Sequence, residues 1–315
     1  MHRRNGGSGR WALIAGCLTG LIVVGPARPA VCGSGRFFDE NAAERSEREP
    51  AESSERTAED LKDRIVTLHE GTSSRAARQD AIERLPLEHL SPEHRRRADA
   101  VLADVHVFRE LPTLLCEIEP DVYRYFIAHP DVAVSIWHAM NISKFQLRPI
   151  APERYSAGDG DGTEGTVEVL YRGGEDTLVL CNGTYNSPLL VRPIETLALM
   201  HLQTGFARTP DGRFFARHRM QLFVSFPTSQ GAATAAKLVS PLSNLIIDRN
   251  FEEITLFLHM MSQVMARQPG WVERLTTRLE NVPDTQKDLL LDVAARVYVA
   301  AQKRATAAAA SEPPQ

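Results

Sequence analysis

Two long segments of alternating apolar and polar residues, separated by a tight turn, set the strongest limit on the fold of this chain. The first extends from Leu197 to Arg208 and the second from Arg213 to Phe226, with Thr-Pro-Asp-Gly between them. Proline, aspartate and glycine favour a turn, and a period of two places successive side chains on opposite faces of a strand. The two segments therefore predict a long antiparallel hairpin within a sheet.

The second segment has an apolar face that contains one histidine. The alternate positions on this face are Phe214, Ala216, His218, Met220, Leu222, Val224 and Phe226. Arg217, Arg219 and Gln221 share the other face, which predicts a sheet with one buried and one solvent-facing side. Two interpretations of His218 remain open: a core histidine bonded to a backbone carbonyl, which is the commoner arrangement, or a histidine in contact with a ligand.

The first segment is predicted to pair with the second and to present its own apolar face. Ala198, Met200, Leu202 and Phe206 share that face. His201 falls on the opposite face because it is one residue out of phase. We therefore expect that His201 and His218 do not form a pair.

The residues before this hairpin alternate between strands and short helices. Thr113 to Glu117 is predicted to be a strand, and two short helices, 120–128 and 130–140, each open with a proline. A second strand is expected to begin at Phe145. The glycine-rich segment 157–162 is interpreted as a loop without the ligand spacing of a calcium site.

Two further strand predictions lie between that loop and the long hairpin. Val167, Val169 and Tyr171 alternate with polar residues, a turn over 172–176 follows, and Leu178 and Leu180 lead back as a hairpin. Residues 187–194 are interpreted as another strand that Pro193 interrupts.

A long helix with one apolar stripe follows the sheet. Asn250 with Glu253 three residues later resembles a capping box, which predicts that the helix begins there, after a short helix at 232–239 and a break near Pro241. The stripe repeats with the period of a helix and consists of Phe251, Ile254, Phe257, Leu258, Met261, Val264 and Met265. His259 lies off this stripe. Two further helices are expected at 272–280 and 284–303.

The segment 61–110 is predicted to be a helical extension. Leu61, Ile65 and Leu68 have helical spacing, and Ser91 followed by Pro92 is typical of a helix start. Along that second helix one apolar stripe is expected from Ala98, Val101, Leu102, Val105 and Phe108. Such a stripe must pack on the rest of the protein, or it serves as an interaction arm.

The N-terminus is typical of an export signal. Three arginines precede an apolar run from Trp11 to Val24, and small residues follow, which predicts a signal peptide over 1–27. The run is shorter than the ~20 residues that span a bilayer. Cleavage predicts a secreted or periplasmic protein. An N-terminal membrane anchor is the alternative, and lipidation at Cys17 also stays open.

Charge argues against a nucleic-acid partner. The net charge is −4, and removal of residues 1–27 with their three arginines lowers it to −7. Nine acidic residues against four arginines lie between Gly33 and Asp60, so 28–60 is interpreted as an acidic disordered linker. The alanine-rich segment 305–315 is interpreted as a disordered tail. In the rest of the chain, positive and negative residues are nearly equal in number, and no basic patch of the kind that binds polyanions is apparent.

The sequence contains no recognisable catalytic or metal-binding motif. Cys32, Cys116 and Cys181 remain after signal cleavage, and the last two have apolar neighbours, as buried unreactive thiols do. No serine-histidine-aspartate set, zinc motif, phosphate loop or paired carboxylates are present. We therefore expect no cofactor and no metal.

The order of predicted elements resembles a known fold. One strand, two short helices, a run of antiparallel strands and a long closing helix are the layout of the helix-grip fold, with local support from 239–242 and 250–253. Residues 111–267 are therefore similar to the START-like superfamily (SRPBCC), also called the polyketide cyclase or Bet v 1-like group. The helices at 268–304 and the N-terminal segment are additions to that pattern.

The resemblance implies an α+β domain in which a curved antiparallel sheet wraps around the last helix. Members of this superfamily hold sterols, phospholipids, polyketides or other apolar molecules in a cavity between sheet and helix. The candidate ligand-binding residues here are His218, Met220, Leu222, Val224, Phe251, Ile254, Phe257, Leu258, Met261 and Met265. Methionine and phenylalanine side chains adapt to ligands of varied shape.

These observations favour an exported protein that binds a lipid or another small hydrophobic molecule. Two other functions remain open. One is a cyclase or hydrolase that uses His218 as a general base or acid, and the other is a non-catalytic interaction module whose cavity is filled by its own side chains. Contact with a membrane surface and the oligomeric state also stay open.

Overall fold

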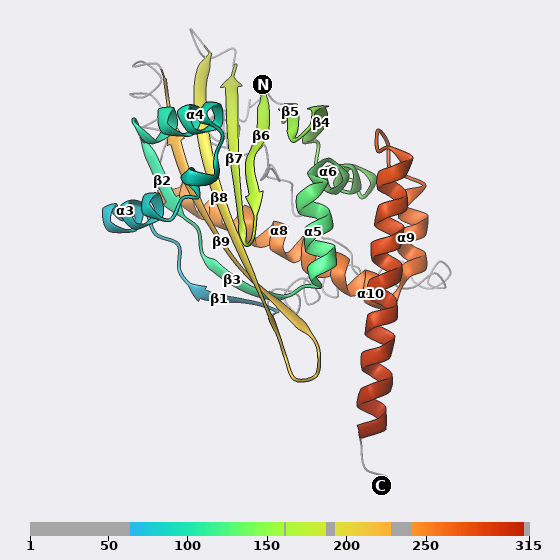
Figure 1. Ribbon diagram of the computed structural model, residues 1–315. Helices are drawn as coiled ribbons and strands as arrows, with labels where there is room; N and C mark the ends of the chain where they lie inside the picture. The colour runs from blue at the N-terminus through green and yellow to red at the C-terminus, as the bar shows by residue number, and fades with distance from the viewer. Residues whose placement is uncertain (1–63, 161, 187–192, 228–240, 312–315) are drawn as a thin grey trace, which may run out of the picture.

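The computed structural model of the chain describes residues 64–160, 162–186, 193–227 and 241–311. This part has an α+β architecture with one large antiparallel sheet and helices on both of its faces (Figure 1). Its strands are β1 Ile65–His69, β2 Val107–Glu110, β3 Thr113–Glu117, β4 Gln146–Ala151, β5 Arg154–Gly158, β6 Thr163–Gly173, β7 Asp176–Tyr185, β8 Ile194–Arg208 and β9 Phe214–Ser225. Its α-helices are α3 Arg75–Glu83, α4 Pro92–Leu102, α5 Pro120–Ala128, α6 Pro130–Ala139, α8 Pro241–Arg267, α9 Pro269–Thr276 and α10 Asp284–Ser311, and Leu87–His89 form a single 3-10 turn.

The sheet places β3, from the first half of the described part, beside β9, its last strand. Its order is β1-β3-β9-β8-β7-β6-β5-β4, and all pairs are antiparallel. β2 and β3 lie end to end along the same edge of β9, with Pro112 between them. Proline lacks the backbone N–H of a ladder bond and marks the break between the two strands. The helices α5 and α6 connect β3 to β4 at the far edge.

The predicted hairpin is confirmed as β8 and β9. Their register pairs every residue from Leu197 with Ser225 to Arg208 with Phe214. Gly212 closes the turn at a φ of +84°, a backbone conformation that glycine adopts without strain. The shorter hairpin of β6 and β7 is confirmed too, with Gly174 in its turn at a φ of +59°.

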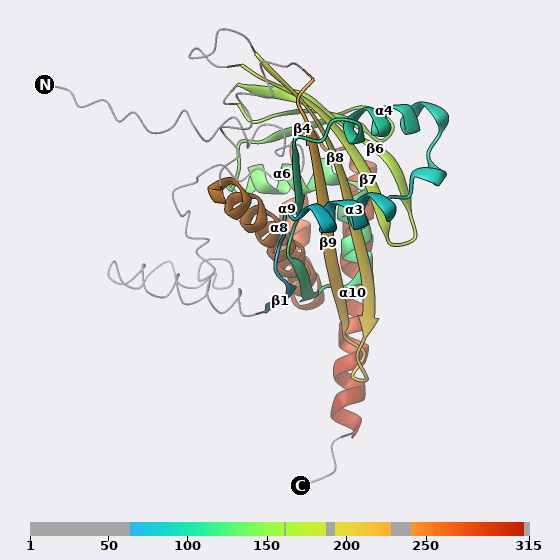
Figure 2. The same cartoon turned by 90° about the vertical axis from the view of Figure 1, so that its left-hand side faces the viewer.

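The inner face of the sheet, which we define by Ala198, Met200, Met220 and Leu222, packs on helices. These residues belong to one hydrophobic core with α5, α6, α8, α9 and α10 (Figure 2). Phe257 of α8 contacts the rings of Phe126 and Trp137 at centroid distances of 5.3 and 5.6 Å. The alternation predicted for β8 and β9 is thus confirmed on this face.

The outer face, defined by Leu199 and Phe223, is covered around these residues and at Gln221, which corrects the prediction of a solvent-facing side there. Towards the hairpin turn Arg217 is exposed, as predicted. A second hydrophobic core joins this face to Ala81 of α3, to Leu85 just after that helix, and to Ala98 and Val101 of α4. Figure 2 shows α3 and α4 on the side of the sheet opposite to α8. Polar residues on this face are buried too: His201 bonds Asp176 at 2.7 Å, and Gln221 donates to Glu110 at 3.1 Å. As predicted, His201 and His218 lie on opposite faces.

The segment 61–110 is not purely helical, in contrast to the prediction. Ile65 and Leu68 lie in β1, because the run Ile-Val-Thr-Leu-His pairs with β3. The helix at Ser91 is confirmed, and the Ser91 hydroxyl accepts the His94 backbone N–H. Phe108 lies in β2 rather than on the α4 stripe, and its ring packs 5.2 Å from that of Phe223.

The long helix α8 begins earlier than predicted. It starts at Pro241, so Asn250 lies inside it and is not its N-cap. Glu253 forms an ion pair with Arg249 at 2.9 Å within the same helix. The final helices also differ at their ends, since α9 starts at Pro269 and α10 continues to Ser311, into the segment predicted to be a tail.

Several predictions lie outside the described residues. These are the signal peptide, the acidic linker, the helix at 232–239 and most of the strand predicted over 187–194. Within the described ranges, no helix has both the length and the hydropathy of a membrane span.

The covered outer face has a measurable consequence. Leu199→Ala should lower the free energy of unfolding by about 2–5 kcal/mol, because Leu199 is fully buried in the second core. The matched control Leu289→Ala, at a position 47% exposed, should change it by about 0.5 kcal/mol or less. Chemical denaturation measures both, and equal values for the two variants would show that the outer face is not packed.

A buried histidine as the candidate functional site

The candidate ligand-binding residues all lie in or beside the hydrophobic core on the inner face of the sheet, which we call the first core. Some are on β9 and the others are on α8. Met220, Leu222 and Val224 on β9 are buried, as are Phe251, Phe257, Leu258, Met261 and Met265 on α8, while Ile254 is partly buried. The ring of His218 lies 6.5 Å from that of Phe251, so β9 and α8 meet at this point. Sequence periodicity was sufficient to place these residues, since each lies on one face of a regular element.

His218 lies at the centre of this surface and is only 2% exposed. Its Nδ1 forms a hydrogen bond of 3.0 Å with the Thr204 hydroxyl, and Thr204 is its direct partner in the β8–β9 register. The Thr204 hydroxyl forms a second bond, 2.6 Å long, with the hydroxyl of Tyr123. The two strands of one hairpin and the distant helix α5 therefore contribute one buried polar chain.

The rings around His218 enclose it in apolar surroundings. Tyr123 of α5 lies 5.2 Å away at an interplanar angle of 33°, and Phe251 of α8 approaches edge-on at 79°. Tyr123 also contacts Phe206 of β8 at 5.5 Å. The imidazole is thus held between the sheet, α5 and α8.

Burial keeps both ends of this polar chain uncharged at neutral pH. Loss of hydration lowers the pKa of His218 from its ordinary value of 6.5 to about 4. Burial raises the pKa of Tyr123 to about 12, against the bond to Thr204 and the charge of Arg172. His218 is therefore a neutral imidazole and Tyr123 a neutral phenol.

One ring nitrogen of His218 has no hydrogen-bond partner among the described residues. Its Nε2 is buried and makes no hydrogen bond within the described part of the chain. Buried polar atoms in native proteins are nearly always paired with protein, water or ligand. His218 is thus buried in the core, as the first of the two interpretations held, but its bond is to a side-chain hydroxyl and not to a backbone carbonyl.

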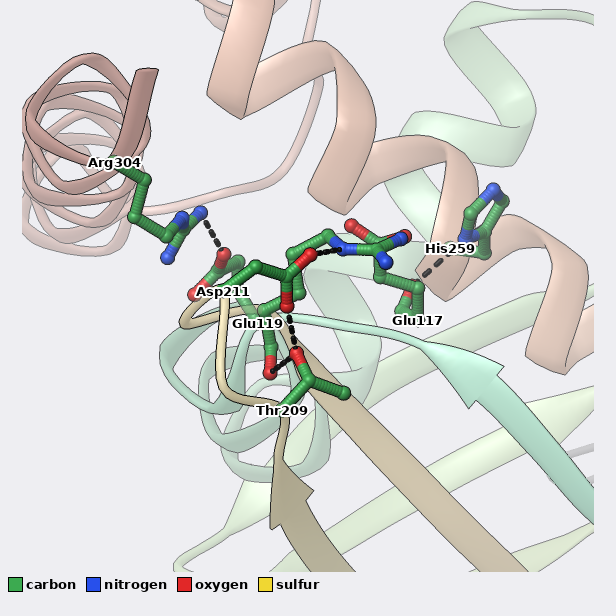
Figure 3. A network of polar contacts seen from close by, with 7 residues as sticks. Glu117, Glu119, Thr209, Asp211, His259 and Arg304 are labelled. Carbon is green, nitrogen blue, oxygen red and sulfur yellow. Dashed lines mark hydrogen bonds and ion pairs between the residues drawn. The ribbon is translucent and has the colours of Figure 1, made fainter. Parts of the chain in front are cut away.

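His259 has the arrangement that was expected of His218. Its Nδ1 bonds the backbone carbonyl oxygen of Glu117 at 2.7 Å, and burial lowers its pKa (Figure 3). As the helical phase predicted, it lies off the main stripe of α8. It points to the end of β3, and it has no bond to the His218 chain.

The surroundings of Glu117 connect the hairpin tip to the helices. Arg213 contacts Glu117 at 3.3 Å and Asp211 at 2.6 Å, and Arg304 of α10 forms an ion pair with Glu119 (Figure 3). Bonds from Thr209 and Arg213 lower the pKa of Asp211 to about 2. The pairs of Arg213 are about half exposed and supply little energy, so we interpret this network as a structural contact.

Methionine is concentrated in the first core. Met200, Met220, Met261 and Met265 are buried there, which is four of the seven methionines of the chain, and Met140 packs against it. Unbranched thioether side chains can change rotamer without leaving the core. This core is thus more adaptable than one built from branched residues.

Sequence reasoning did not identify Tyr123 and Thr204. Thr204 lies between Leu202 and Phe206 on the predicted inner face, so its alternation was a usable signal. Tyr123 gave no such signal, because its contact spans 81 residues.

The described residues contain no group of three or more histidine, cysteine, aspartate or glutamate side chains that could hold a metal. Cys116 and Cys181 are free and buried, and burial raises the pKa of each to about 12, which makes them poor nucleophiles. No family model and no curated protein matches this chain.

The buried imidazole predicts a loss of stability in acid. In the unfolded chain His218 takes up a proton near pH 6.5, but in the folded protein only near pH 4. Stability is therefore lost as the pH falls through this window, by about 3 kcal/mol from this residue. His218→Gln should reduce the difference in unfolding free energy between pH 7 and pH 4 by about that amount.

The control is His89→Gln, which removes a histidine whose side chain is 54% exposed. It should retain the wild-type difference between the two pH values. Since burial also lowers the pKa of His201 and His259, some acid sensitivity should remain in every variant. An unchanged pH dependence in His218→Gln would contradict a neutral, buried His218.

Proposed function

We propose that this protein binds a small apolar molecule between the inner face of the sheet and α8. The main support is a buried imidazole nitrogen that has no partner among the described residues, on a ring packed against Tyr123 and Phe251 and facing a core that contains four methionines. Burying a polar atom without a partner costs free energy. Other buried polar atoms of the described residues, among them Nδ1 of His201 and Nε2 of His259, also lack a partner, and His218 differs from these two in the rings of Tyr123 and Phe251 that pack against it. A ligand that brings a polar group to His218 and covers the methionines with an apolar body would satisfy both features.

We further infer that the domain has the helix-grip arrangement of the START-like superfamily. The strand order supports this, because β3 and β9 are neighbours and α5 and α6 connect β3 to the far edge. The position of α8 after β9, in contact with the inner face at His218, supports it as well. The covering of the outer face by α3 and α4 is an addition to that arrangement.

The catalytic alternative has weaker support. A general base works best when its pKa is near the working pH, whereas burial lowers that of His218 to about 4. In the described residues its hydrogen bond is to a threonine, and burial alone accounts for its pKa. Within the described ranges no carboxylate bonds this imidazole in the way that the carboxylate of a catalytic triad bonds its histidine.

Native mass spectrometry of protein purified without detergent tests the proposal. We expect the intact protein to carry an added mass that organic solvent removes and that reappears in the extract as an apolar molecule. Protein that is ligand-free and does not bind the fluorescent apolar dye Nile red would contradict the proposed function.

Two adjacent methionines provide a matched pair of variants. Met261 is 2% exposed in the first core, whereas Met260 is only partly buried and lies outside both cores. Met261→Ala should weaken Nile red binding about five- to tenfold, because it removes apolar contact with the ligand. Met260→Ala should change it less than about twofold, and equal effects would place the binding surface elsewhere.

We also propose that the protein is exported and cleaved after Ala27, on the strength of its N-terminal sequence. In a bacterial host the mature protein should leave the cytoplasm and begin at Arg28. Leu21→Arg should block export by interrupting the apolar run, whereas Leu21→Ala should not. A mature N-terminus at Cys17 that is lost in Cys17→Ser would instead show a lipoprotein.

A further inference from the structure

The direction of the hydrogen bonds in the Tyr123–Thr204–His218 chain can be determined by counting protons. The chain contains two hydroxyl protons and one imidazole proton, and it links Tyr123 Oη, Thr204 Oγ1 and His218 Nδ1 at 2.6 and 3.0 Å. A neutral histidine carries its proton on either Nδ1 or Nε2, and the partner of the other nitrogen decides which.

A proton on Nδ1 leaves two polar groups unsatisfied. Nδ1 would then donate to the Thr204 hydroxyl. The bond between the hydroxyls of Tyr123 and Thr204 could then use the proton of only one of them. One of these protons would have no acceptor among the described residues, and the lone pair of Nε2 would be unpaired too. Each such buried group costs free energy.

A proton on Nε2 leaves only one polar group unsatisfied. Tyr123 then donates to Thr204, and Thr204 donates to Nδ1, so both hydroxyl protons are used. The single group left over is the Nε2–H itself, which is buried and has no acceptor in the described part of the chain. Burial keeps the phenol protonated and the imidazole neutral, as this arrangement requires.

We propose that Tyr123 and Thr204 hold His218 as a hydrogen-bond donor, so that the bound molecule carries an uncharged oxygen acceptor, such as a ketone, ester or ether oxygen, at this end. This inference rests on the proposed function and names the chemical class of its ligand. A neutral imidazole cannot compensate the charge of a buried carboxylate. An ammonium group would place its own donors against the Nε2–H.

Nitrogen NMR of protein labelled with ¹⁵N-histidine tests the proton position directly. His218→Gln assigns the signals, and wild-type protein at pH 7 should show a protonated Nε2 and an unprotonated Nδ1. Thr204→Val, which removes the donor to Nδ1, should lose this preference, and Thr204→Ser should restore it. A proton on Nδ1 in the wild type would overturn the inference.

A set of three probes tests the ligand class, with displacement of Nile red as the readout. 2-Hexadecanone offers an acceptor, hexadecane offers neither donor nor acceptor, and hexadecylammonium offers donors only. Wild-type protein should bind the ketone about tenfold more tightly than the alkane, and the ammonium no more tightly than the alkane. Thr204→Val should reduce the preference for the ketone below about threefold, and Thr204→Ser should retain it.

The outcomes separate the two proposals. Binding of all three probes without preference would overturn the acceptor inference and leave the proposed function standing. Failure of every probe to displace the dye would contradict the proposed function, and the ligand class would fall with it. Unfolding midpoints of the variants distinguish a lost hydrogen bond from a lost fold.

Discussion

The ladder between β8 and β9 is the constraint on which the rest of this structure depends. Its twelve residue pairs hold two side-chain sets in fixed alternation, one toward α8 and one toward α3 and α4. A shift of one residue in the register of β9 would turn each of its side chains to the opposite face. The residues that now pack in the inner core would then face the outer core, and the reverse. The same register sets Thr204 beside His218 and keeps His201 on the other face with Asp176. The pairing of β8 with β9 thus places the Thr204 hydroxyl where it can bond His218 at the candidate site.

The imidazole of His218 is a feature of the inner core that packing alone does not explain. Apolar side chains would fill the position of His218 at lower cost, because burial penalises even a neutral imidazole that lacks a partner. Thr204 and Tyr123 satisfy only one of its two nitrogens. The methionines of the inner core supply side chains that can change rotamer, whereas the buried residues of the outer core are mainly leucine, with phenylalanine and alanine and without methionine. This difference between the two cores is the reason for proposing that the inner one receives a ligand and the outer one stabilises the sheet.

The sequence predicted those features that depend on local periodicity. The hairpin, the inward alternation of β9 and the stripe of α8 each repeat over many residues, and all three are present. Features that depend on distant contacts were missed. The outer face of β9 mixes arginine with Phe223, so only the docking of α3 and α4 shows that it is buried. Ile65 and Leu68 fit a helical period, but pairing with β3 makes them a strand. Asn250 with Glu253 has the local pattern of a cap, yet the helix had already begun at Pro241. The contact between Tyr123 and Thr204 joins α5 to β8, and no local pattern reports it.

An experimental structure of the protein purified without detergent is the most direct test of this account. We expect density for an elongated molecule between α8 and β9. One non-carbon atom of that molecule should lie about 3 Å from Nε2 of His218, which is the length of a hydrogen bond. Density of that kind would give Nε2 of His218 the hydrogen-bond partner that it lacks among the described residues. A core in which Phe251, Met261 and the neighbouring side chains close completely around His218, with no molecule present, would contradict this account.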